Sequence, residues 1–491
     1  MKILMISAEV VPFAKTGGLA DAVSALSIAL EKAGHDVKII MPRYYKIDRK
    51  KLTKLDGPLG IPFNYNETWS AVYTTTLPGS NSLPVYFIDH EQSFGREGVY
   101  GNPLEPDFHD NVSRFSILCN SAFQLCHKLN WYPEIIHSHD WSASLANVLL
   151  KFNQRWKPEF AHTASILTIH NLGYQGNYDK INYPKTGLDW INYHTSGFED
   201  YGRMNFLKAG LISSDILTTV SPTYAEEIQT FEGGFGLDGI LRYRNKRLFG
   251  ILNGVDTEYW NPEKDKRIKQ NYTVKSINKK MINKKFLQEK MGLEVNENIP
   301  VIGIITRLVA QKGIAELFAP TYGSAYNICA SMNVQMVVLG SGETWCEDEI
   351  RNLQAKLPNF RAYIGYDEDL SHQIEAGSDF FLMPSKYEPC GLNQMYSLLY
   401  GTLPIVRRTG GLADTVQQYC EKTGEGTGFL FDNLTPQSIY DTVGWAVYAW
   451  YNKREHIEQM KIRGMKKDFT WDKSAKEYKD VYKFALKNIC Y

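Results

Sequence analysis

The sequence predicts an α/β protein made of two doubly wound domains. Short apolar runs recur along most of the chain, and stretches with the apolar spacing of helices follow several of them. In addition, Lys15-Thr-Gly-Gly-Leu-Ala-Asp-Ala-Val recurs almost unchanged as Arg408-Thr-Gly-Gly-Leu-Ala-Asp-Thr-Val, and each copy follows an apolar run and opens a predicted helix. Strands that alternate with helices form parallel sheets covered on both faces. The recurrence indicates two such sheets, although a duplication kept only for packing explains it as well.

Buried parallel strands account for the apolar runs. After the first run, apolar residues from Leu19 to Ala33 are spaced by three and four, which predicts a helix that Gly34 ends. The runs expected as strands are residues 3–6, 37–40, 134–136, 166–169, 216–220, 248–252, 301–305, 335–339, 380–383 and 403–406.

The segment 264–290 differs from the rest of the chain. It holds ten Lys and Arg residues against two acidic residues and contains no strand-like run. We expect a solvated helix that links the two domains, because a run of like charges is usually exposed to water; a docking patch is the alternative. A new series of strands begins at Ile299, so the domain boundary is expected near this segment.

Composition excludes several classes of protein. The 491 residues are 43% hydrophobic and 22% charged, which is ordinary for a globular chain and excludes a disordered one. Lys and Arg number 54, as do Asp and Glu, so no net charge recruits nucleic acid or an anionic membrane. No run of 18 apolar residues predicts a membrane span. Seven cysteines without a C-x-x-C pair, and no signal peptide before the first strand, predict a cytoplasmic protein.

Polar segments follow the predicted strands. In open α/β sheets, ligands bind beyond the carboxyl ends of the strands. In the first half these segments are Lys15-Thr-Gly-Gly, His137-Ser-His-Asp-Trp, His170-Asn-Leu-Gly-Tyr, Ser221-Pro-Thr and Asn253-Gly-Val-Asp; in the second half they are Thr306-Arg, Gly340-Ser-Gly-Glu, Pro384-Ser-Lys-Tyr-Glu-Pro-Cys-Gly and Arg408-Thr-Gly-Gly. We therefore expect a polar wall on each domain and a cleft between them.

Several of these residues suit an anionic ligand. Arg307 and Lys312 stand between a strand and the next helix, where two cations suit a diphosphate; an exposed loop pair is the alternative. Glu388 also precedes a helix, so it can accept hydrogen bonds from sugar hydroxyls while the N–H groups of residues 390–392 face a phosphate. The glycines after Lys15 let N–H groups approach an anion, but a plain tight turn fits equally well.

Histidines mark one of these strand ends. His170 directly follows a predicted strand, where a role in ligand contact and a structural role are about equally expected. The spacing of His137, His139 and Asp140 hints at a metal ion, yet no further cluster in the sequence completes a ligand set. We therefore expect no metal.

These motifs resemble those of bacterial glycogen synthases and plant starch synthases, the retaining, ADP-glucose-type glycosyltransferases of family 5. Further segments that carry the resemblance are Arg307-Leu-Val-Ala-Gln-Lys-Gly and Tyr400-Gly-Thr-Leu-Pro-Ile-Val-Arg-Arg, and it extends from Lys2 to about Trp471. It implies a GT-B fold, in which two Rossmann-like domains face an interdomain cleft. Residues 1–258 would form the acceptor-side domain, residues 259–472 the nucleotide-sugar-binding domain, and residues 473–491 a helix that crosses back to the first domain.

The resemblance implies a reaction and its participants. Glucose would pass from ADP-glucose to the nonreducing 4-hydroxyl of an α-1,4-glucan with retention of configuration, without a metal or other cofactor. The residues similar to the family's catalytic groups are Lys15, His170, Arg307, Lys312 and Glu388. Those similar to its substrate-binding groups are Lys15, Gly18, Asp21, Asp140, Asn171, Asn253, Tyr366, Cys390, Gly391 and Leu392, of which Tyr366 is similar to the tyrosine that stacks on the base.

Charge development explains why the reaction would need these residues. Departure of ADP places negative charge on the diphosphate, which Lys15, Arg307 and Lys312 would stabilise, and positive charge on the anomeric carbon, which the His170 carbonyl would face. No carboxylate stands out as a nucleophile, so front-face substitution is favoured over a scheme with two carboxylates. Lys15 and Arg307 fall in different predicted domains, so closure of the cleft is expected.

The sequence also departs from the family pattern. Asn393 stands where threonine is common and Gly173 where alanine is common, so we expect altered donor contacts. Residues 318–333 have no close counterpart in the family pattern. Other interpretations remain: a glucan phosphorylase with a lysine-bound pyridoxal cofactor, another GT-B glucosyltransferase, or a glucan-binding protein without activity, because a fold alone does not fix function.

Overall fold

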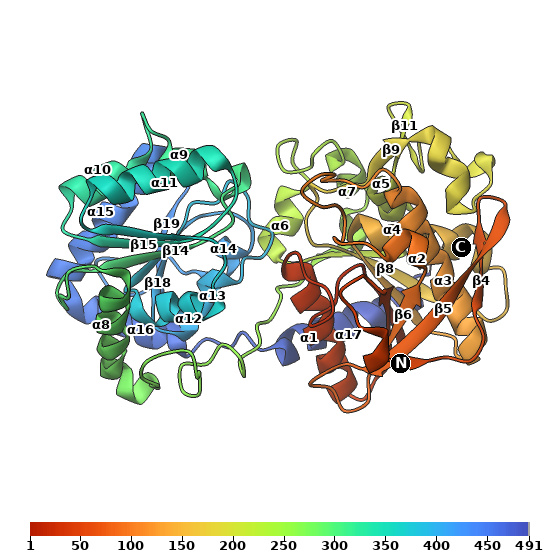
Figure 1. Cartoon of the computed structure of the whole chain (residues 1–491), viewed down its shortest axis with the longest axis horizontal. Helices are drawn as coiled ribbons and strands as arrows, with labels where there is room; N and C mark the ends of the chain where they lie inside the picture. The colour runs from red at the N-terminus through yellow and green to blue at the C-terminus, as the bar shows by residue number, and fades with distance from the viewer. Residues whose placement is uncertain (490–491) are drawn as a thin grey trace. The chain divides into compact units, whose positions relative to one another are not determined.

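The computed structural model describes residues 1–489, and the chain divides into two compact units (Figure 1). The first unit consists of Met1–Gly254 together with the chain from Trp471 onward, and the second of Val255–Thr470. The units therefore part at residues 254/255 and 470/471, beside the predicted boundaries at 258/259 and 472/473. The acceptor and nucleotide-sugar roles of the two domains stay predictions.

A large mixed sheet forms the centre of the first unit. Its strands lie in the order β13-β12-β8-β7-β1-β2-β6-β5-β3, and β4 pairs with β5. The strands from β13 to β6 in this order are parallel, whereas β5 runs antiparallel to its neighbours. The bounds are β1 (Lys2–Ile6), β2 (Asp36–Pro42), β3 (Thr53–Lys54), β4 (Leu59–Phe63), β5 (Asn66–Thr76), β6 (Pro84–Asp89), β7 (Ile135–His139), β8 (Ala164–Ile169), β12 (Ile216–Thr219) and β13 (Leu248–Gly250). A separate antiparallel sheet holds β9 (Asn177–Asp179), β10 (Glu199–Asp200) and β11 (Arg203–Asn205).

The antiparallel edge of this sheet was not predicted. Strand β5 is rich in threonine and contains no apolar run, and of its residues only Ser70 and Val72 are buried. A two-residue turn, Asn64-Tyr65, joins it to β4, and both residues have positive φ angles of 53° and 58°. Such φ values suit the tight turn of a hairpin, but this pair lacks the glycine that usually signals one.

Helices cover the sheet of the first unit. The predicted helix after β1 is confirmed as α1, which spans Gly18–Lys32. Cys119 and Cys126 are both buried on α3. The C-terminal helix α17 packs against α1 and β8 (Figure 1). The bounds are α2 (Glu91–Phe94), α3 (Asn111–Leu129), α4 (Asp140–Leu149), α5 (Phe206–Ser213), α6 (Pro222–Glu227), α7 (Asp238–Tyr243) and α17 (Trp471–Lys487).

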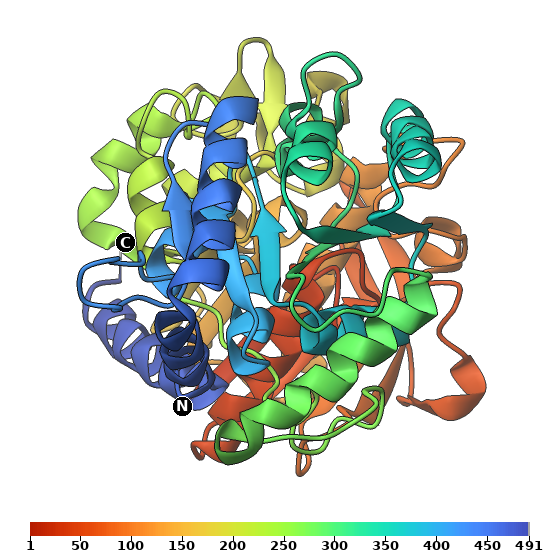
Figure 2. The same cartoon turned by 90° about the vertical axis from the view of Figure 1, so that its left-hand side faces the viewer.

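The second unit has a wholly parallel sheet, which Figure 2 shows from its own side. The strand order is β16-β15-β14-β17-β18-β19. Its strands are β14 (Val301–Ile305), β15 (Gln335–Gly340), β16 (Phe360–Ile364), β17 (Phe380–Met383), β18 (Leu403–Arg407) and β19 (Phe429–Phe431). Its helices are α8 (Lys280–Met291), α9 (Ile314–Phe318), α10 (Ser324–Ser331), α11 (Thr344–Lys356), α12 (Glu368–Gly377), α13 (Asn393–Leu399), α14 (Gly410–Thr415), α15 (Pro436–Asn452) and α16 (Arg454–Met465).

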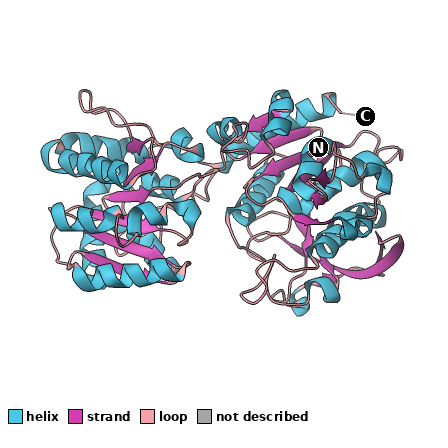
Figure 3. Ribbon diagram, turned by 90° about the horizontal axis from the view of Figure 1, so that it is seen from above, coloured by secondary structure: helices cyan, strands magenta, loops and turns pink. Residues whose placement is uncertain are grey.

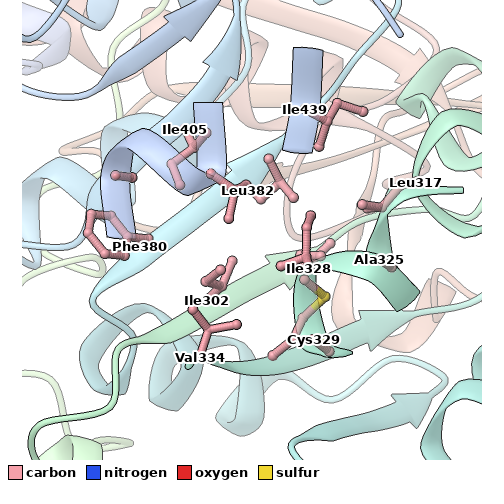
Figure 4. Close-up of a cluster of buried hydrophobic side chains, with 14 of the residues drawn as sticks. Ile302, Leu317, Ala325, Ile328, Cys329, Val334, Phe380, Leu382, Ile405 and Ile439 are labelled. Atoms are coloured by element: carbon pink, nitrogen blue, oxygen red, sulfur yellow. The ribbon is translucent and has the colours of Figure 1, made fainter. Parts of the chain in front are cut away.

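Both faces of the second sheet are buried, as Figure 3 shows by the helices on either side of the strands. Alternate residues such as Ile302, Leu382 and Ile405 point to one face, where α9, α10 and α15 cover them (Figure 4). The residues between them, such as Val301 and Phe381, pack against α8 and α12 on the other face. Burial on two faces explains why β14, β15, β17 and β18 read as continuous apolar runs, and the predicted positions of these four strands are confirmed. Among residues 1–489, no helix is both long enough and apolar enough to cross a membrane.

The expectation of a solvated helix over residues 264–290 is wrong. The segment contains a short 3₁₀ turn over Val274–Lys279 and then α8, which packs on α12. Lys280 is buried, and its Nζ donates to two carbonyl oxygens in the last turn of α12. Lys284 is buried as well and pairs with Asp379 at 2.8 Å. A count of charges does not show where each side chain points. On the inner face of α8, Lys280 lies at the negative, carboxyl-terminal end of α12, and Lys284 lies at the Asp379 carboxylate.

Candidate functional site

In the second unit, candidate residues gather at the carboxyl ends of two neighbouring parallel strands. Arg307 and Lys312 follow β14, and Glu388 lies in the loop between β17 and α13. Because β14 and β17 are hydrogen-bonded neighbours, these loops leave the sheet at the same edge. That edge is where ligands bind in open α/β sheets. The structure therefore brings together three of the residues that the sequence singled out.

Glu388 is buried and has two partners. Nζ of Lys312 lies 2.5 Å from Oε2 of Glu388, and the Ser385 hydroxyl donates to the same oxygen at 2.9 Å. Both partners use Oε2, so Oε1 is the oxygen left to accept further hydrogen bonds. A buried carboxylate needs such partners, since an unpaired buried charge is costly. The arrangement yields a fixed acceptor, Oε1, next to a cation.

Three glycines hold the Glu388 loop by letting backbones approach closely. A Cβ at Gly313 would lie 2.0 Å from the carbonyl oxygen of Pro384. A Cβ at Gly410 would lie 1.9 Å from that of Glu388, and one at Gly411 would lie 1.9 Å from that of Cys390. Gly313 and Gly410 also have positive φ angles of 69° and 43°. Only glycine fits such contacts, so the second Thr-Gly-Gly segment serves as packing for the site loop.

Arg307 and Tyr366 lie on the surface of the same unit. Arg307 is exposed, and none of residues 1–489 pairs with its guanidinium. Tyr366 follows β16 and is 81% exposed. An exposed guanidinium is available to an anionic ligand and an exposed ring is available for stacking. Their contacts with a nucleotide stay predictions.

The residues after Glu388 form a loop that precedes helix α13. Cys390 is buried, Gly391 has a φ of 70°, and Leu392 is the N-cap residue of α13. The N–H groups of residues 390–392 therefore belong to the loop, and their contact with phosphate stays a prediction. Nδ2 of Asn393 donates to the carbonyl of Ile305 at 3.0 Å, at the end of β14. The amide that departs from the family pattern thus ties α13 to β14.

In the first unit, the Lys15 loop is anchored from beneath by Glu9. Glu9 is buried, and its carboxylate accepts hydrogen bonds from the N–H group and the hydroxyl of Thr16. Burial raises the pKa of Glu9 above its usual value. Lys15 is largely exposed, and its Nζ lies 2.9 Å from Asp21. Gly18 is the first residue of α1, directly before the predicted apolar series that starts at Leu19, and its contact with phosphate stays a prediction.

Asp140 holds the backbone at His170. Its Oδ1 accepts from the N–H of His170 at 2.7 Å and from that of Asn171 at 3.4 Å. Asp140 itself has a φ of 56°, an unusual value for a residue other than glycine that marks a constrained position. Burial raises the pKa of Asp140 to about 7. These three predicted residues are therefore brought together at the carboxyl ends of β7 and β8.

The two histidines expected beyond a strand lie inside one instead. β7 extends to His139, so His137 and His139 belong to the strand. His137 contacts Tyr482 of α17 through Nδ1 at 2.8 Å and Thr168 through Nε2 at 2.6 Å. Both of its ring nitrogens are thus used. Among residues 1–489, no group of three or more His, Cys, Asp or Glu side chains is arranged to hold a metal ion.

Asn253 is set apart from these clusters. It follows the edge strand β13 and is buried next to the point where the first unit ends. Its neighbour Gly254 packs against Trp471, whose N would lie 2.7 Å from a Cβ there. Among residues 1–489, no hydrogen bond joins the Asn253 side chain to the other predicted site residues of its unit, and its role in binding stays a prediction.

Two residues that support the site were not predicted. The Tyr100 hydroxyl donates to Oε1 of Glu9 at 2.8 Å, from a loop far away in the sequence. No local pattern connects the two residues, so no sequence signal was available. Ser385, the second donor to Glu388, lies in the segment 384–391 that the sequence analysis singled out. It precedes Glu388 by three residues, and this short spacing could have indicated their hydrogen bond.

Comparisons with known proteins agree with this geometry. Residues 2–243 match the family model of the starch synthase catalytic domain, and residues 286–463 match that of glycosyl transferases group 1. A glycogen synthase of Treponema denticola is 62% identical over 486 residues, which cover 99% of each chain. A glycogen synthase of Thermotoga maritima is 42% identical over the full length of both chains.

Solved structures show the same fold. The catalytic domain of starch synthase IV from Arabidopsis thaliana, bound to ADP and acarbose, matches with a TM-score of 0.87 and 33% identity over 99% of each chain. A sucrose-phosphate synthase from Thermosynechococcus elongatus matches with a TM-score of 0.60 at 15% identity, which supports the fold alone. The protein is therefore a glycosyltransferase of the GT-B fold, with two doubly wound domains. Within this class, the chain belongs to the family of glycogen synthases and starch synthases.

Proposed function

We propose that this protein transfers glucose from ADP-glucose to the nonreducing 4-hydroxyl of an α-1,4-glucan, with retention of configuration. Support comes from the family, from the ADP that is bound to the matching starch synthase structure, and from the chemistry of the site. We further infer a cytoplasmic location, which the six free cysteines among residues 1–489 support.

The observation that carries the proposal is the arrangement of Lys312, Glu388 and Arg307 at one sheet edge. An ammonium group has three N–H donors, and Lys312 directs one of them to Glu388. The remaining donors and the exposed Arg307 are available to diphosphate oxygens. Oε1 of Glu388 is available to a sugar hydroxyl a short distance away. A cationic part for the diphosphate and an anionic part for the hexose thus lie side by side, as a nucleotide sugar requires.

Stabilisation of the leaving group would come from cations. Departure of ADP builds up negative charge on the diphosphate, and Lys15, Arg307 and Lys312 are the groups proposed to meet it. Preorganised donors of this kind are each worth about 2.7–4 kcal/mol of the activation barrier, or roughly a hundred- to a thousandfold in rate.

The positive charge on the anomeric carbon would face the carbonyl of His170. The C=O group of a trans peptide points away from its N–H group. The N–H of Asn171 faces Asp140, so the carbonyl of His170, which belongs to the same peptide, faces the opposite way. Glu388 is committed to Lys312 and Ser385, which suits a role in holding the sugar more than a role as nucleophile. These features support front-face substitution, in which the departing phosphate accepts the proton of the acceptor hydroxyl.

A coupled assay of ADP release with glycogen and ADP-glucose tests the proposal. We expect Lys312→Ala and Glu388→Gln each to lower kcat by roughly a hundredfold or more. Lys386→Ala is the matched control, since this exposed lysine lies in the same loop. Near-normal turnover in both site variants would contradict the assignment.

Two further measurements separate the alternatives. A comparison of ADP-glucose with UDP-glucose as donors is expected to favour ADP-glucose. Release of glucose 1-phosphate from glycogen and phosphate, together with the absorbance of a pyridoxal cofactor, would instead indicate a phosphorylase. Binding of glycogen without any release of ADP would indicate a binding protein.

A further inference from the structure

A chain of three histidine rings lies beneath the candidate site of the first unit. Nδ1 of His139 lies 3.1 Å from Nε2 of His170, at hydrogen-bond distance. The rings of His137 and His139 are in contact, with centroids 4.2 Å apart and the ring planes tilted by 31°. His139 therefore connects the interior of the unit with the partly buried His170.

The ring of His139 has a fixed orientation. It contacts the ring of His137, which is itself held at both nitrogens by Tyr482 and Thr168. His139 is also paired with Thr168 in the register of β7 and β8, so its backbone is fixed by the sheet. A ring that is constrained in this way presents its nitrogens in defined directions.

The position of the proton follows from the surroundings of Nε2 of His139. This atom is buried, and it has no hydrogen-bond partner among residues 1–489. A buried N–H group without an acceptor is rarer and more costly than an unused lone pair. Burial lowers the pKa of all three histidines, and that of His170 to about 3, so each ring is neutral and carries one N–H. The proton of His139 therefore belongs on Nδ1, and it is donated to Nε2 of His170.

We propose that His139 is a positioning residue that fixes His170 as the tautomer protonated at Nδ1. Nδ1 of His170 has no partner among the described residues, and His170 is only partly buried. Its N–H is then a hydrogen-bond donor that no group among residues 1–489 uses. Such a donor suits a hydroxyl oxygen of the transferred sugar, an assignment that rests on the proposed function.

Two consecutive residues thus hold His170 in different ways. Asp140 fixes its backbone through the N–H groups of residues 170 and 171, and His139 fixes its ring and tautomer. The sharp turn at Asp140, with its positive φ, lets both side chains reach the same neighbour from one strand end. A carbonyl and a ring N–H of one residue are thereby placed together.

The substitutions His139→Gln and His139→Asn test the inference. The amide of Asn reaches the position of Nδ1 and can still donate to His170, whereas that of Gln reaches the position of Nε2. We expect His139→Gln to lower kcat by about tenfold or more with little change in KM, and His139→Asn to keep most of the activity. His127→Gln is the matched control, because its Nδ1 contacts only Tyr132, at 3.2 Å, on another part of the unit.

Nitrogen NMR of histidine-labelled protein reads out the tautomer without any need for catalysis. The His170 signals are assigned by their loss in His170→Gln. We expect a protonated Nδ1 and a bare Nε2 at His170 in the unaltered protein and in His139→Asn, and a mixture of tautomers in His139→Gln. A protonated Nε2 at His170 in the unaltered protein would overturn the inference, even if a variant failed to fold. So would unchanged kcat and tautomer in His139→Gln.

Failure of the proposed function gives a different result. Normal turnover in His170→Gln would remove His170 from the reaction while the NMR spectrum still reported its tautomer. Loss of turnover in His170→Gln, with normal turnover in His139→Gln, would overturn only the role of His139.

Discussion

The two Thr-Gly-Gly segments share almost one sequence and differ in what surrounds them. At the first copy, Gly17 has an extended φ of −158°, and no atom of residues 1–489 lies within 4 Å of the place its Cβ would take. At the second copy, Gly410 and Gly411 touch the backbone of the Glu388 loop so closely that a Cβ would overlap it. One copy is open, and the other is a packing element.

The cations that precede the two segments differ as well. Lys15 is largely exposed and pairs with Asp21 within its own segment. Arg408 pairs instead with Asp432, which follows β19. The same motif therefore leaves an exposed cation in the first unit and packs against the Glu388 loop in the second. Both segments begin helices, and from the difference in their packing we propose that only the first copy contacts substrate.

The largest expected difference is catalytic. We expect Lys15→Ala to lower kcat for ADP release about a hundred- to a thousandfold, since it removes one donor to the developing charge on the diphosphate. Arg408→Ala is expected to leave kcat within about threefold, because an exposed ion pair contributes little. Equal losses in the two variants, measured at saturating ADP-glucose and glycogen, would contradict the distinction between the copies.

The next difference concerns stability. Gly411→Ala places a methyl group 1.9 Å from the carbonyl oxygen of Cys390. We therefore expect the free energy of unfolding to fall by about 1–3 kcal/mol. We also expect the Glu388 loop to be displaced and kcat to be reduced. Gly17→Ala has open space and an ordinary φ, and we expect a change below about 1 kcal/mol. Urea unfolding followed by fluorescence measures both. Similar losses at the two positions would show that the glycines are equivalent.

A smaller difference lies in the dependence of stability on pH. Burial raises the pKa of Glu9, which lies beneath the first copy. Its favourable contribution is fully present below pH 4.5, the ordinary pKa, and falls as pH rises through the raised pKa. Glu9→Gln removes this titration, so its stability relative to the unaltered protein should increase with pH. Tyr100→Phe removes a donor to the carboxylate and should raise the pKa of Glu9 further. A stability difference between Glu9→Gln and the unaltered protein that is constant with pH would contradict this account.

The smallest expected effect is that of the exposed ion pairs. Asp432→Asn removes the partner of Arg408, and Asp21→Asn removes that of Lys15. Each is expected to change the free energy of unfolding by about 0–1 kcal/mol. Only Asp21→Asn should also alter KM for the donor, since it changes the position of Lys15, the lysine that we propose contacts the ligand. A larger KM effect from Asp432→Asn would reverse the two roles.

Much of the fold was predictable because parallel strands buried on both faces read as apolar runs. β14 and β17 have the predicted bounds, and α1 begins where the glycines and apolar spacing indicated. The antiparallel edge at β5 was not predictable, because a half-exposed strand rich in threonine gives no such run. The buried Lys280 was missed because a count of charges does not show which face of a helix a side chain occupies.

The candidate site was predictable in its residues and less so in its contacts. The sequence placed Glu388 and Lys312 near a common ligand, but it did not show that they pair with each other. Asn253 was singled out because it follows a predicted strand, as the other loop residues do. That strand, β13, lies at the edge of the sheet, and the sequence does not show which strand is at the edge. Long-range contacts such as that of Tyr100 with Glu9 leave no local pattern.

A crystal structure with ADP bound is the most direct test of the account. We expect hydrogen bonds from Lys15, Arg307 and Lys312 to the diphosphate, with the rings of the base beside Tyr366. A diphosphate bound at Arg408, with Lys15 still paired only with Asp21, would contradict the roles assigned to the two Thr-Gly-Gly segments.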